Sequence, residues 1–334
     1  MTSREIIRRI VRRDAPVRIG WDFLDERYQD IAYFSPAILD NPKARKFAEW
    51  GYYPELKKKT GGFTGEMRMD TYGNIYGRYE GRTKGECLRG ALHDGWAAFE
   101  KYRFPKVIEF IDEPAPDPDK YRIAGLPTAV FSVIRDMRHM DNALIDTIAE
   151  PEMVVEFLRR LVGLSVEIID LAAKHGADAA FICDDWGTQT GPLVSPKCFR
   201  ALFKPAYRAI ADACHERGLD FILHSCGCVI DLVDDMIDAG IDAFQFDQPE
   251  LAGSHVWAQR YGKRAAFYCP VDIQKVMATG NREYIEATAL EMVTAFKEND
   301  DALIAKDYPS LSDIGVELEW AKWAMDVIVA NSAL

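Results

Sequence analysis

No run of apolar residues in this sequence approaches the roughly 18 residues that a membrane-spanning helix requires. Positive charge is also scarce, because 41 lysines and arginines face 53 aspartates and glutamates, which gives a formal net charge of −12 at pH 7. This acidity disfavours nucleic acid or an anionic membrane as a partner. The seven cysteines do not form the dense framework of a small secreted protein. We therefore expect free thiols and a cytoplasmic location.

The short motifs of several large enzyme classes are missing as well. No Gly-x-Gly-x-x-Gly follows a predicted strand and no Gly-x-x-x-x-Gly-Lys occurs, so a dinucleotide-binding fold and a P-loop lack their best markers. Nothing resembles the Gly-x-Ser-x-Gly turn of serine hydrolases or the His-Glu-x-x-His helix of zinc proteases. The function must therefore be sought in residues that the fold brings together from distant parts of the chain.

The sequence does contain a regular succession of strands and helices from residue 121 to residue 334. Apolar stretches of strand length alternate there with amphipathic helices, which is typical of βα units and a parallel sheet. We expect one or two strands within residues 67–111 and further strands near 17–21, 124–131, 179–183, 220–224, 243–247, 264–269 and 302–306. About eight units in a chain of this length favour an α/β fold of the (β/α)8 TIM-barrel type, as a single domain over residues 1–334.

Residues 1–120 are less regular and predict a helical and hairpin extension of the barrel. Apolar residues at helical spacing predict an amphipathic helix over residues 1–13. Side chains alternate on both sides of Gly73-Asn74, which predicts a β-hairpin over residues 67–79.

Polar side chains with metal-binding or acid–base chemistry stand at the carboxyl ends of the predicted strands. In a parallel barrel these ends meet around one pocket, where active sites are built. The residues at those ends are Asp22, Asp184, Asp185, His224, Cys226, Asp247, Cys269 and Asp307. We expect them to share one site, in which every aspartate except Asp22 is a candidate for proton transfer or for orienting substrate and ligands.

His224 and Cys226 lie two residues apart where a strand opens into its loop, so both side chains can bind one ion. Cys269, two strands further along the barrel rim, is our expected third ligand. One imidazole and two thiolates suit Zn²⁺, and three protein ligands leave the open position of a catalytic zinc. Asp307 and Cys228 remain alternatives for the third position.

Several stretches of the chain resemble the uroporphyrinogen decarboxylase-like superfamily, and the resemblance covers most of the sequence. They are Asp184-Asp-Trp-Gly-Thr-Gln189, Ser195-Pro-Lys-Cys-Phe199, His224-Ser-Cys-Gly227, Asp238-Ala-Gly-Ile-Asp-Ala243 and Cys269-Pro-Val-Asp-Ile-Gln274. The resemblance implies a (β/α)8 barrel. Together the motifs are specific for the superfamily and much less specific for a reaction.

Within the superfamily, the sequence is more similar to the zinc methyltransferases than to the true decarboxylases. The decarboxylases carry arginines in an N-terminal segment that binds the carboxylates of the tetrapyrrole, whereas this chain has Ile19-Gly-Trp-Asp-Phe-Leu-Asp-Glu-Arg27 there. The acidic residues of this segment would repel a polycarboxylate. The methyltransferases bind zinc through a His-x-Cys pair, which His224-Ser-Cys226 matches, and a later cysteine near the last strand, where this chain has Lys306-Asp307.

The resemblance thus implies a zinc-dependent methyltransferase that exchanges a methyl group between a methylated or methoxylated small compound, or a thiol, and a corrinoid carried by a partner protein. The residues expected to contact the substrate are Asp22, Trp186, Gln189 and Gln274. A metal-free decarboxylase of the uroporphyrinogen type is one alternative, and a non-catalytic partner of a corrinoid protein is another. A homodimer is a further expectation.

Overall fold

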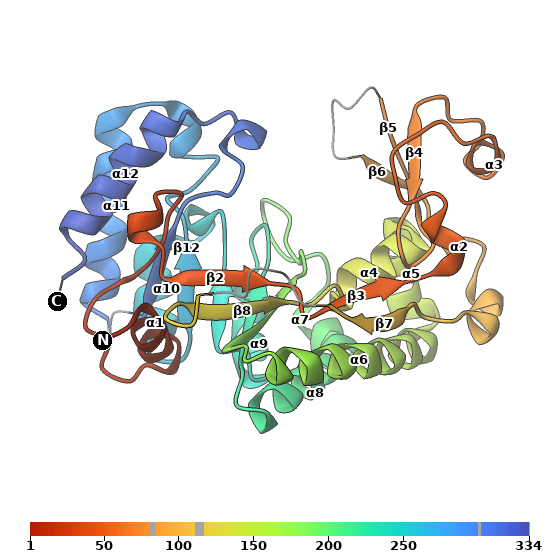
Figure 1. The fold of residues 1–334 in the computed structure, drawn as a ribbon, viewed down its shortest axis with the longest axis horizontal. Helices are drawn as coiled ribbons and strands as arrows, with labels where there is room; N and C mark the ends of the chain where they lie inside the picture. The colour runs from red at the N-terminus through yellow and green to blue at the C-terminus, as the bar shows by residue number, and fades with distance from the viewer. Residues whose placement is uncertain (80–84, 111–116, 300–301, 334) are drawn as a thin grey trace.

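A computed structural model of the protein describes residues 1–79, 85–110, 117–299 and 302–333, and it has the predicted barrel of parallel strands (Figure 1). Each strand of the barrel is hydrogen-bonded in parallel to the next. In order of pairing they are β1 (Gly20–Asp22), β13 (Leu303–Lys306), β12 (Ala266–Cys269), β11 (Ala243–Gln245), β10 (Asp220–His224), β9 (Ala179–Cys183), β8 (Tyr121–Gly125) and β2 (Ile31–Phe34). The strand pairing leaves one gap, between β1 and β2 at the two ends of this order, so the barrel is nearly closed.

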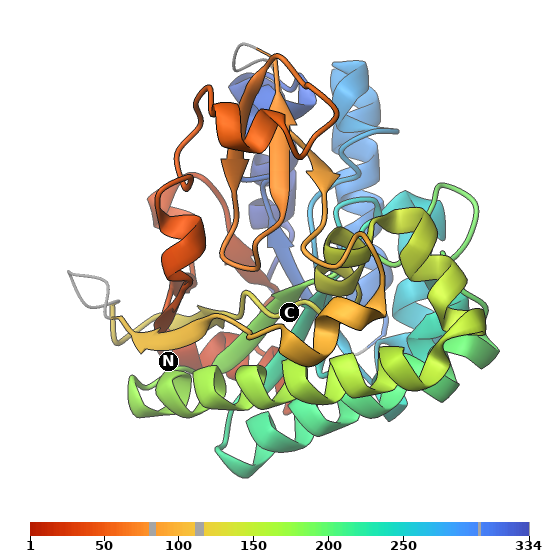
Figure 2. The same ribbon diagram turned by 90° about the vertical axis from the view of Figure 1, so that its right-hand side faces the viewer.

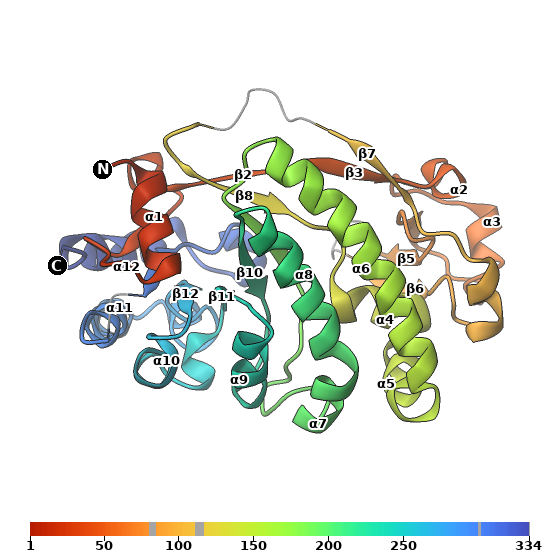
Figure 3. The ribbon, with the colours of Figure 1, turned by 90° about the horizontal axis from the view of Figure 1, so that it is seen from below.

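Helices connect the strands and cover the outside of the barrel, as Figure 3 shows from below. They are α4 (Val130–Arg138), α5 (Met140–Ala149), α6 (Pro151–Lys174), α7 (Pro196–Cys198), α8 (Lys204–Glu216), α9 (Ile230–Asp238), α10 (Ser254–Tyr261), α11 (Arg282–Lys297) and α12 (Leu318–Ala330). A π-helical turn at Phe199–Phe203 joins α7 to α8, and short 3-10 helices lie at Glu26–Tyr28, Trp96–Lys101, Pro249–Leu251, Met277–Thr279 and Leu311–Ile314. Within the described residues, none of the helices combines the length and the apolar character needed to cross a membrane.

Side chains on the two faces of each strand pack into two separate apolar cores. In β9, for example, Ala179 packs in the core inside the barrel, whereas Ala180 and Ile182 pack in the larger core between the sheet and the helices. Because side chains alternate between the two faces of a strand, the residue two positions further on returns to the interior. This alternation decides which side chains at a strand end can reach the central pocket.

Helix α1 (Ser3–Arg12) closes the amino-terminal end of the barrel, as its predicted amphipathic pattern allows. Its apolar side chains belong to the interior core: they are Ile6, Ile7, Ile10 and Val11. Arg4 and Arg8 form ion pairs with Asp178, which precedes β9, and Arg12 pairs with Asp220 at the start of β10. The amino-terminal end of the barrel is therefore filled by apolar side chains and surrounded by ion pairs.

The remaining N-terminal residues form a lobe beside the carboxyl end of the barrel (Figures 1 and 2). A two-stranded antiparallel sheet consists of β3 (Ala37–Asp40) and β7 (Lys106–Glu109). A three-stranded antiparallel sheet consists of β4 (Glu66–Met69), β5 (Ile75–Arg78) and β6 (Glu86–Arg89), and the short helices α2 (Pro42–Arg45) and α3 (Pro54–Lys57) accompany it. The predicted hairpin around Gly73-Asn74 is confirmed as β4 and β5.

Two predictions about the barrel strands were wrong. The eighth strand is β2, at Ile31–Phe34. The strands that the structure describes within 67–79 and 85–110 pair antiparallel outside the barrel. The strand expected at 124–131 is β8, at Tyr121–Gly125, and α4 already begins at Val130. Pro127 lies between the two elements and, lacking an amide hydrogen, cannot continue the strand's ladder of hydrogen bonds.

Candidate metal and substrate site

A cavity of about 560 Å³ opens at the carboxyl end of the barrel. Its floor is made by inward-facing side chains at the ends of the strands. The residues that line it are Asp22, Phe23, Leu24, Gln29, Tyr33, Phe181, Cys183, His224, Gln245, Asp247, Tyr268, Lys306, Asp307, Tyr308, Pro309 and Ser310. This is the position at which barrel enzymes bind their substrates, and the volume suits a small organic molecule.

Asp185, His224 and Cys226 come together beside this cavity, and His224 lines it. The Nε2 atom of His224 lies 3.3 Å from Sγ of Cys226 and 3.4 Å from Oδ1 of Asp185. One ligand atom from each residue lies within 4.8 Å of the other two, and no other trio of His, Cys, Asp or Glu in the described chain does this. Nitrogen, sulfur and oxygen ligands arranged tetrahedrally around zinc would be about 3.3–3.6 Å apart. The group therefore has the spacing and the donor atoms that zinc accepts.

Two loops that cross at a pair of glycines hold this group together. A Cβ atom on Gly227 would lie 2.3 Å from the backbone of Gly187, and Gly227 has a φ of +79°. The Gly187 amide donates a hydrogen bond of 3.1 Å to the carbonyl of Cys226, and the Cys226 amide donates one of 3.0 Å to Oδ1 of Asp185. Only glycine permits this approach of the two backbones. Asp-Asp-Trp-Gly and His-Ser-Cys-Gly are thus two halves of one structure.

The charges of the three groups depend on one another. Burial opposes a positive charge on His224, but its hydrogen bonds with Asp185 and Cys226 outweigh burial and raise its pKa to about 10. Burial alone would raise the pKa of Asp185, but hydrogen bonds from His224 and Cys226 lower it to about 2. Burial raises the pKa of the Cys226 thiol. Without a metal, a proton on His224 thus supplies the positive charge that the surrounding donor atoms favour.

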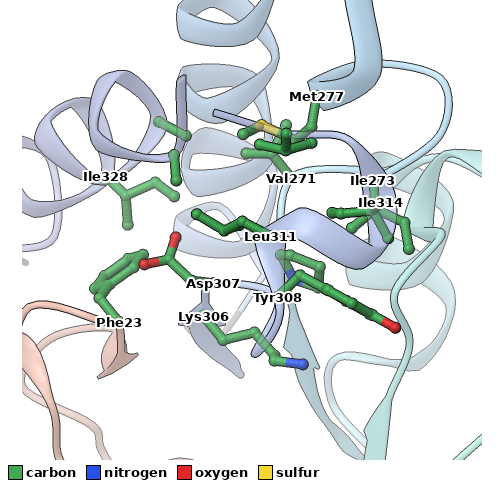
Figure 4. Close-up of a pocket in the computed structure, with 14 residues that line it drawn as sticks. Phe23, Val271, Ile273, Met277, Lys306, Asp307, Tyr308, Leu311, Ile314 and Ile328 are labelled. Carbon is green, nitrogen blue, oxygen red and sulfur yellow. The ribbon is translucent and has the colours of Figure 1, made fainter. Parts of the chain in front are cut away.

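The opposite side of the cavity carries two carboxyl groups that favour their protonated form. Burial raises the pKa of Asp22 to about 6, even though Tyr268 donates a hydrogen bond to it. Burial raises the pKa of Asp307 to about 6 as well, although the amide of Leu24 donates a hydrogen bond of 2.9 Å to it. Figure 4 shows why: Asp307 is turned toward Phe23 beside a small apolar pocket of about 10 Å³, while the amine of Lys306 points away from it.

Residues 97–305 of the chain match the family model described as uroporphyrinogen decarboxylase (URO-D). The chain belongs to this family. The matched region contains Asp185, His224 and Cys226, and it spans the barrel strands from β8 to β12 and most of β13.

A search of the curated proteins found no match, whereas a search of the solved structures found similar chains. A methyltransferase from Methanosarcina mazei is similar, with a TM-score of 0.52 and 18% identity over 68% of this chain and 72% of that chain. A D-allulose 3-epimerase from Methylomonas sp. has a TM-score of 0.41 and 14% identity over 64% of this chain and 87% of that chain. A xylose isomerase-like TIM barrel from Mycobacterium smegmatis has a TM-score of 0.36 and 14% identity over 64% of this chain and 74% of that chain. At these identities the likeness shows the fold alone.

The structure of this URO-D family member places Cys269 away from the group formed by His224 and Cys226. In β12 it is Tyr268 that faces the barrel interior, so Cys269 faces the helices and is buried in the outer core. Asp185, which we expected among the proton-transfer candidates, stands where the third ligand was expected. The two alternatives, Cys228 and Asp307, are also outside the trio.

Asp184 and Trp186 are buried beside the site and do not line the cavity. Asp184 accepts hydrogen bonds from the amides of Phe131 and Ser132 at the start of α4, so it acts as the N-terminal cap that this helix otherwise lacks. Trp186 has no exposed surface and stacks on Phe131. Both residues support the loop that carries Asp185.

The remaining expected residues occupy two places. Asp22, Asp247 and Asp307 line the cavity. Gln189 and Gln274 are not among the residues that line it, and the side-chain amide of Gln248 donates hydrogen bonds of 3.5 Å and 2.7 Å to them. The same Gln248 accepts a hydrogen bond of 3.3 Å from the Gly227 amide, so this glutamine cluster supports the metal-ligand loop.

The cavity residues that sequence reasoning missed include Tyr33, Cys183, Gln245, Tyr268 and Lys306. Tyr33 lies on the strand that was not predicted. The other four follow the interior alternation of strands that were predicted, two residues after an interior apolar residue: Phe181 precedes Cys183, for example, and Ile304 precedes Lys306. Strict alternation from the apolar interior residues would have found them.

The substitutions Asp22→Asn and Asp307→Asn are each expected to stabilise the protein at pH 7.5 and not at pH 4. A carboxyl whose pKa rises from 3.8 in the unfolded chain to about 6 contributes stability below pH 4 that is lost as the pH rises through 6. An asparagine cannot ionise and avoids this loss. After allowance for solvent screening, we expect a gain of about 1–2 kcal/mol in the free energy of unfolding at pH 7.5.

Urea unfolding at the two pH values measures this difference. Asp212→Asn, at an exposed position on α8, controls for the loss of one negative charge. An equal gain at pH 4 and pH 7.5 would show that the ionisation of these carboxyls is not its cause.

Proposed function

We propose that this URO-D family member is a zinc-dependent methyltransferase that exchanges a methyl group between a methylated or methoxylated small compound, or a thiol, and a corrinoid carried by a partner protein. The observation that carries the proposal is the convergence of Asp185 and Cys226 on His224, a residue that lines a substrate-sized cavity. The M. mazei protein that shares the barrel is a methyltransferase, which supports the same assignment.

The three residues fit zinc better than magnesium or calcium. A thiol and an imidazole are soft and borderline donors, whereas magnesium and calcium take oxygen ligands. Asp185, His224 and Cys226 would be the protein ligands, which leaves one position open as in catalytic zinc sites. When bound, zinc would act there as a Lewis acid that activates a thiol or an ether oxygen.

The other residues of the cavity have separable tasks in this proposal. Tyr33, Phe181 and Tyr308 line the substrate space with aromatic surface and limit the entry of water. Asp22 and Asp307 hold a proton up to about pH 6 and exchange it with the oxygen or sulfur atom that loses or gains the methyl group.

The charge of the cavity separates this proposal from decarboxylation of uroporphyrinogen. Three aspartates line the cavity, and Lys306 and His224 are the two lining side chains among the described residues that can carry positive charge. Lys306 already pairs with Asp247 at 3.1 Å. A substrate with many carboxylates would therefore find little unpaired positive charge.

The test combines metal analysis with methyl transfer. We expect the purified protein to hold about one zinc per chain and to catalyse zinc-dependent methyl transfer from methoxylated compounds to cob(I)alamin, or from methylcob(III)alamin to thiols. Absorbance of the corrinoid follows the reaction, and removal of zinc with a chelator should abolish it, with recovery when zinc is added back.

Two results would contradict the proposal. Turnover of uroporphyrinogen by protein without metal would establish the decarboxylase alternative. Absence of zinc together with absence of both activities, while the chain still binds a corrinoid protein, would establish the non-catalytic alternative.

A further inference from the structure

A buried chain of hydrogen bonds runs from the metal-binding group to Lys306. Nδ1 of His224 is hydrogen-bonded to Oε1 of Gln245, whose side-chain amide nitrogen donates a bond of 2.7 Å to Oδ1 of Asp247. Nζ of Lys306 donates to the same Oδ1 at 3.1 Å. Gln245, Asp247 and Lys306 are each less than 8% exposed. The chain therefore connects the carboxyl ends of β10, β11 and β13 along the lining of the cavity, with little exposed surface.

The direction of each hydrogen bond follows from the chemistry of Lys306. An ammonium group can only donate, and an ionised carboxylate can only accept, so Asp247 must receive a hydrogen bond from the amide nitrogen of Gln245. Gln245 is thereby oriented with its oxygen toward His224. Because an amide oxygen cannot donate, Nδ1 of His224 must carry the hydrogen of its bond to Gln245.

We infer that Gln245, Asp247 and Lys306 are positioning residues that hold His224 in the tautomer with hydrogen on Nδ1, so that the lone pair of Nε2 faces Cys226 and Asp185. The inference rests on the proposed function, because the purpose of that tautomer is to bind a metal through Nε2. Ligand histidines in metal sites are ordinarily oriented by such a partner at their second nitrogen. Here the orientation of His224 depends on the ion pair of Asp247 and Lys306, which acts on the histidine through Gln245.

Packing alone does not account for this arrangement. A buried ion pair carries a large desolvation penalty, and apolar residues of similar size often serve stability as well or better. The neighbouring interior positions are apolar, as Ala243 and Ile304 show. The polar chain appears at the level of the cavity and reaches one ligand atom, Nδ1 of His224, directly.

The substitution Gln245→Met tests the inference because it keeps the length of the side chain and removes its acceptor. We expect the affinity for zinc, measured by competition with a chromophoric chelator on the metal-free protein, to fall about 10- to 100-fold. Tyr268→Phe is the matched control: Tyr268 pairs in register with Gln245 and is equally buried, but its hydroxyl bonds Asp22 and Tyr33. Its zinc affinity should equal that of the wild type.

A second variant and a spectroscopic readout separate orientation from general damage. Asp247→Ala should also weaken zinc binding, and the double variant should bind zinc no more weakly than Gln245→Met alone, because both changes break one chain. In the zinc-loaded wild type labelled with ¹⁵N-histidine, the ring signals of His224 should show hydrogen on Nδ1. In Gln245→Met this hydrogen has lost its acceptor, so it should exchange with water faster than in the wild type.

The outcomes distinguish the inference from the proposed function. Wild-type protein that binds no zinc would refute the proposed function. Wild-type protein that binds zinc, with the Gln245→Met protein folded, equal in affinity and unchanged in the exchange of the Nδ1 hydrogen with water, would overturn the inference alone. If Gln245→Met does not fold, unchanged zinc affinity in Asp247→Ala would overturn it.

Discussion

Under the proposed function, the Cys226→Ser protein is expected to bind zinc more than 100-fold more weakly than the wild type and to lose methyl transfer. Loss of a residue that only orients a ligand already costs about 10- to 100-fold in metal affinity, and loss of the thiolate itself removes a direct bond. Cys226 contacts Nε2 of His224 at 3.3 Å, so serine would replace the soft donor of the group with a neutral hydroxyl. Chelator competition and metal analysis measure the change.

The neighbouring thiols provide matched controls. Cys228→Ser lies in the same loop, and Cys269→Ser lies on β12, but neither residue belongs to the metal-binding trio. Both variants should retain zinc affinity, whereas Asp185→Asn should lose a large part of it. If Cys269→Ser lost zinc and Asp185→Asn kept it, the sequence-based choice of third ligand would be restored and the arrangement described here would be refuted.

Gly227→Ala is expected to be the most destabilising single-methyl change at the site. A non-glycine residue at a φ of +79° costs roughly 1–2 kcal/mol, and the added Cβ would lie 2.3 Å from the carbonyl carbon and oxygen of Gly187. Backbone atoms cannot move aside as a flexible side chain can, so we expect a total loss of about 3 kcal/mol or more in the free energy of unfolding.

Gly218→Ala isolates the contribution of the contact. Gly218 has a φ of +76°, but a Cβ atom there would meet nothing within 4 Å. It should therefore cost only the conformational strain, about 1–2 kcal/mol, in the same urea unfolding experiment. Equal losses in the two variants would mean that the loops separate easily and that the crossing does not hold the metal ligands.

The sequence predicted the barrel strands well where each strand is a clear apolar run between two helices. The strands at Ala179–Cys183 and Asp220–His224 have the predicted bounds, because each is an apolar run that ends at a polar residue and is enclosed by helix signals. It failed at Ile31–Phe34, where four residues between polar segments give too short a pattern to separate from a loop. Short strands owe their conformation to neighbours that are remote in sequence.

The site was predictable in part for the same reason. His224 and Cys226 were found because they lie at the end of a well-defined strand, and the structure brings them together. Cys269 was chosen because it ends a strand, but it is one residue out of step with the interior face, which Tyr268 occupies. Asp185 lies beyond the end of its strand, and its direction is set by the crossing of Gly187 and Gly227, which no pattern within either segment reveals.

Helix α1 closes the amino-terminal end of the barrel, and this closure has a consequence for the order in which the reactants of the proposed reaction bind. Apolar side chains and the ion pairs of Asp178 and Asp220 fill that end, so the approach to His224 is from the side of the strands' carboxyl ends. In the proposed reaction, a small compound and a much larger corrinoid protein would both have to approach from this side. Under the proposed function we expect compulsory-order kinetics, in which the small molecule enters before the protein docks and an excess of the corrinoid protein inhibits turnover.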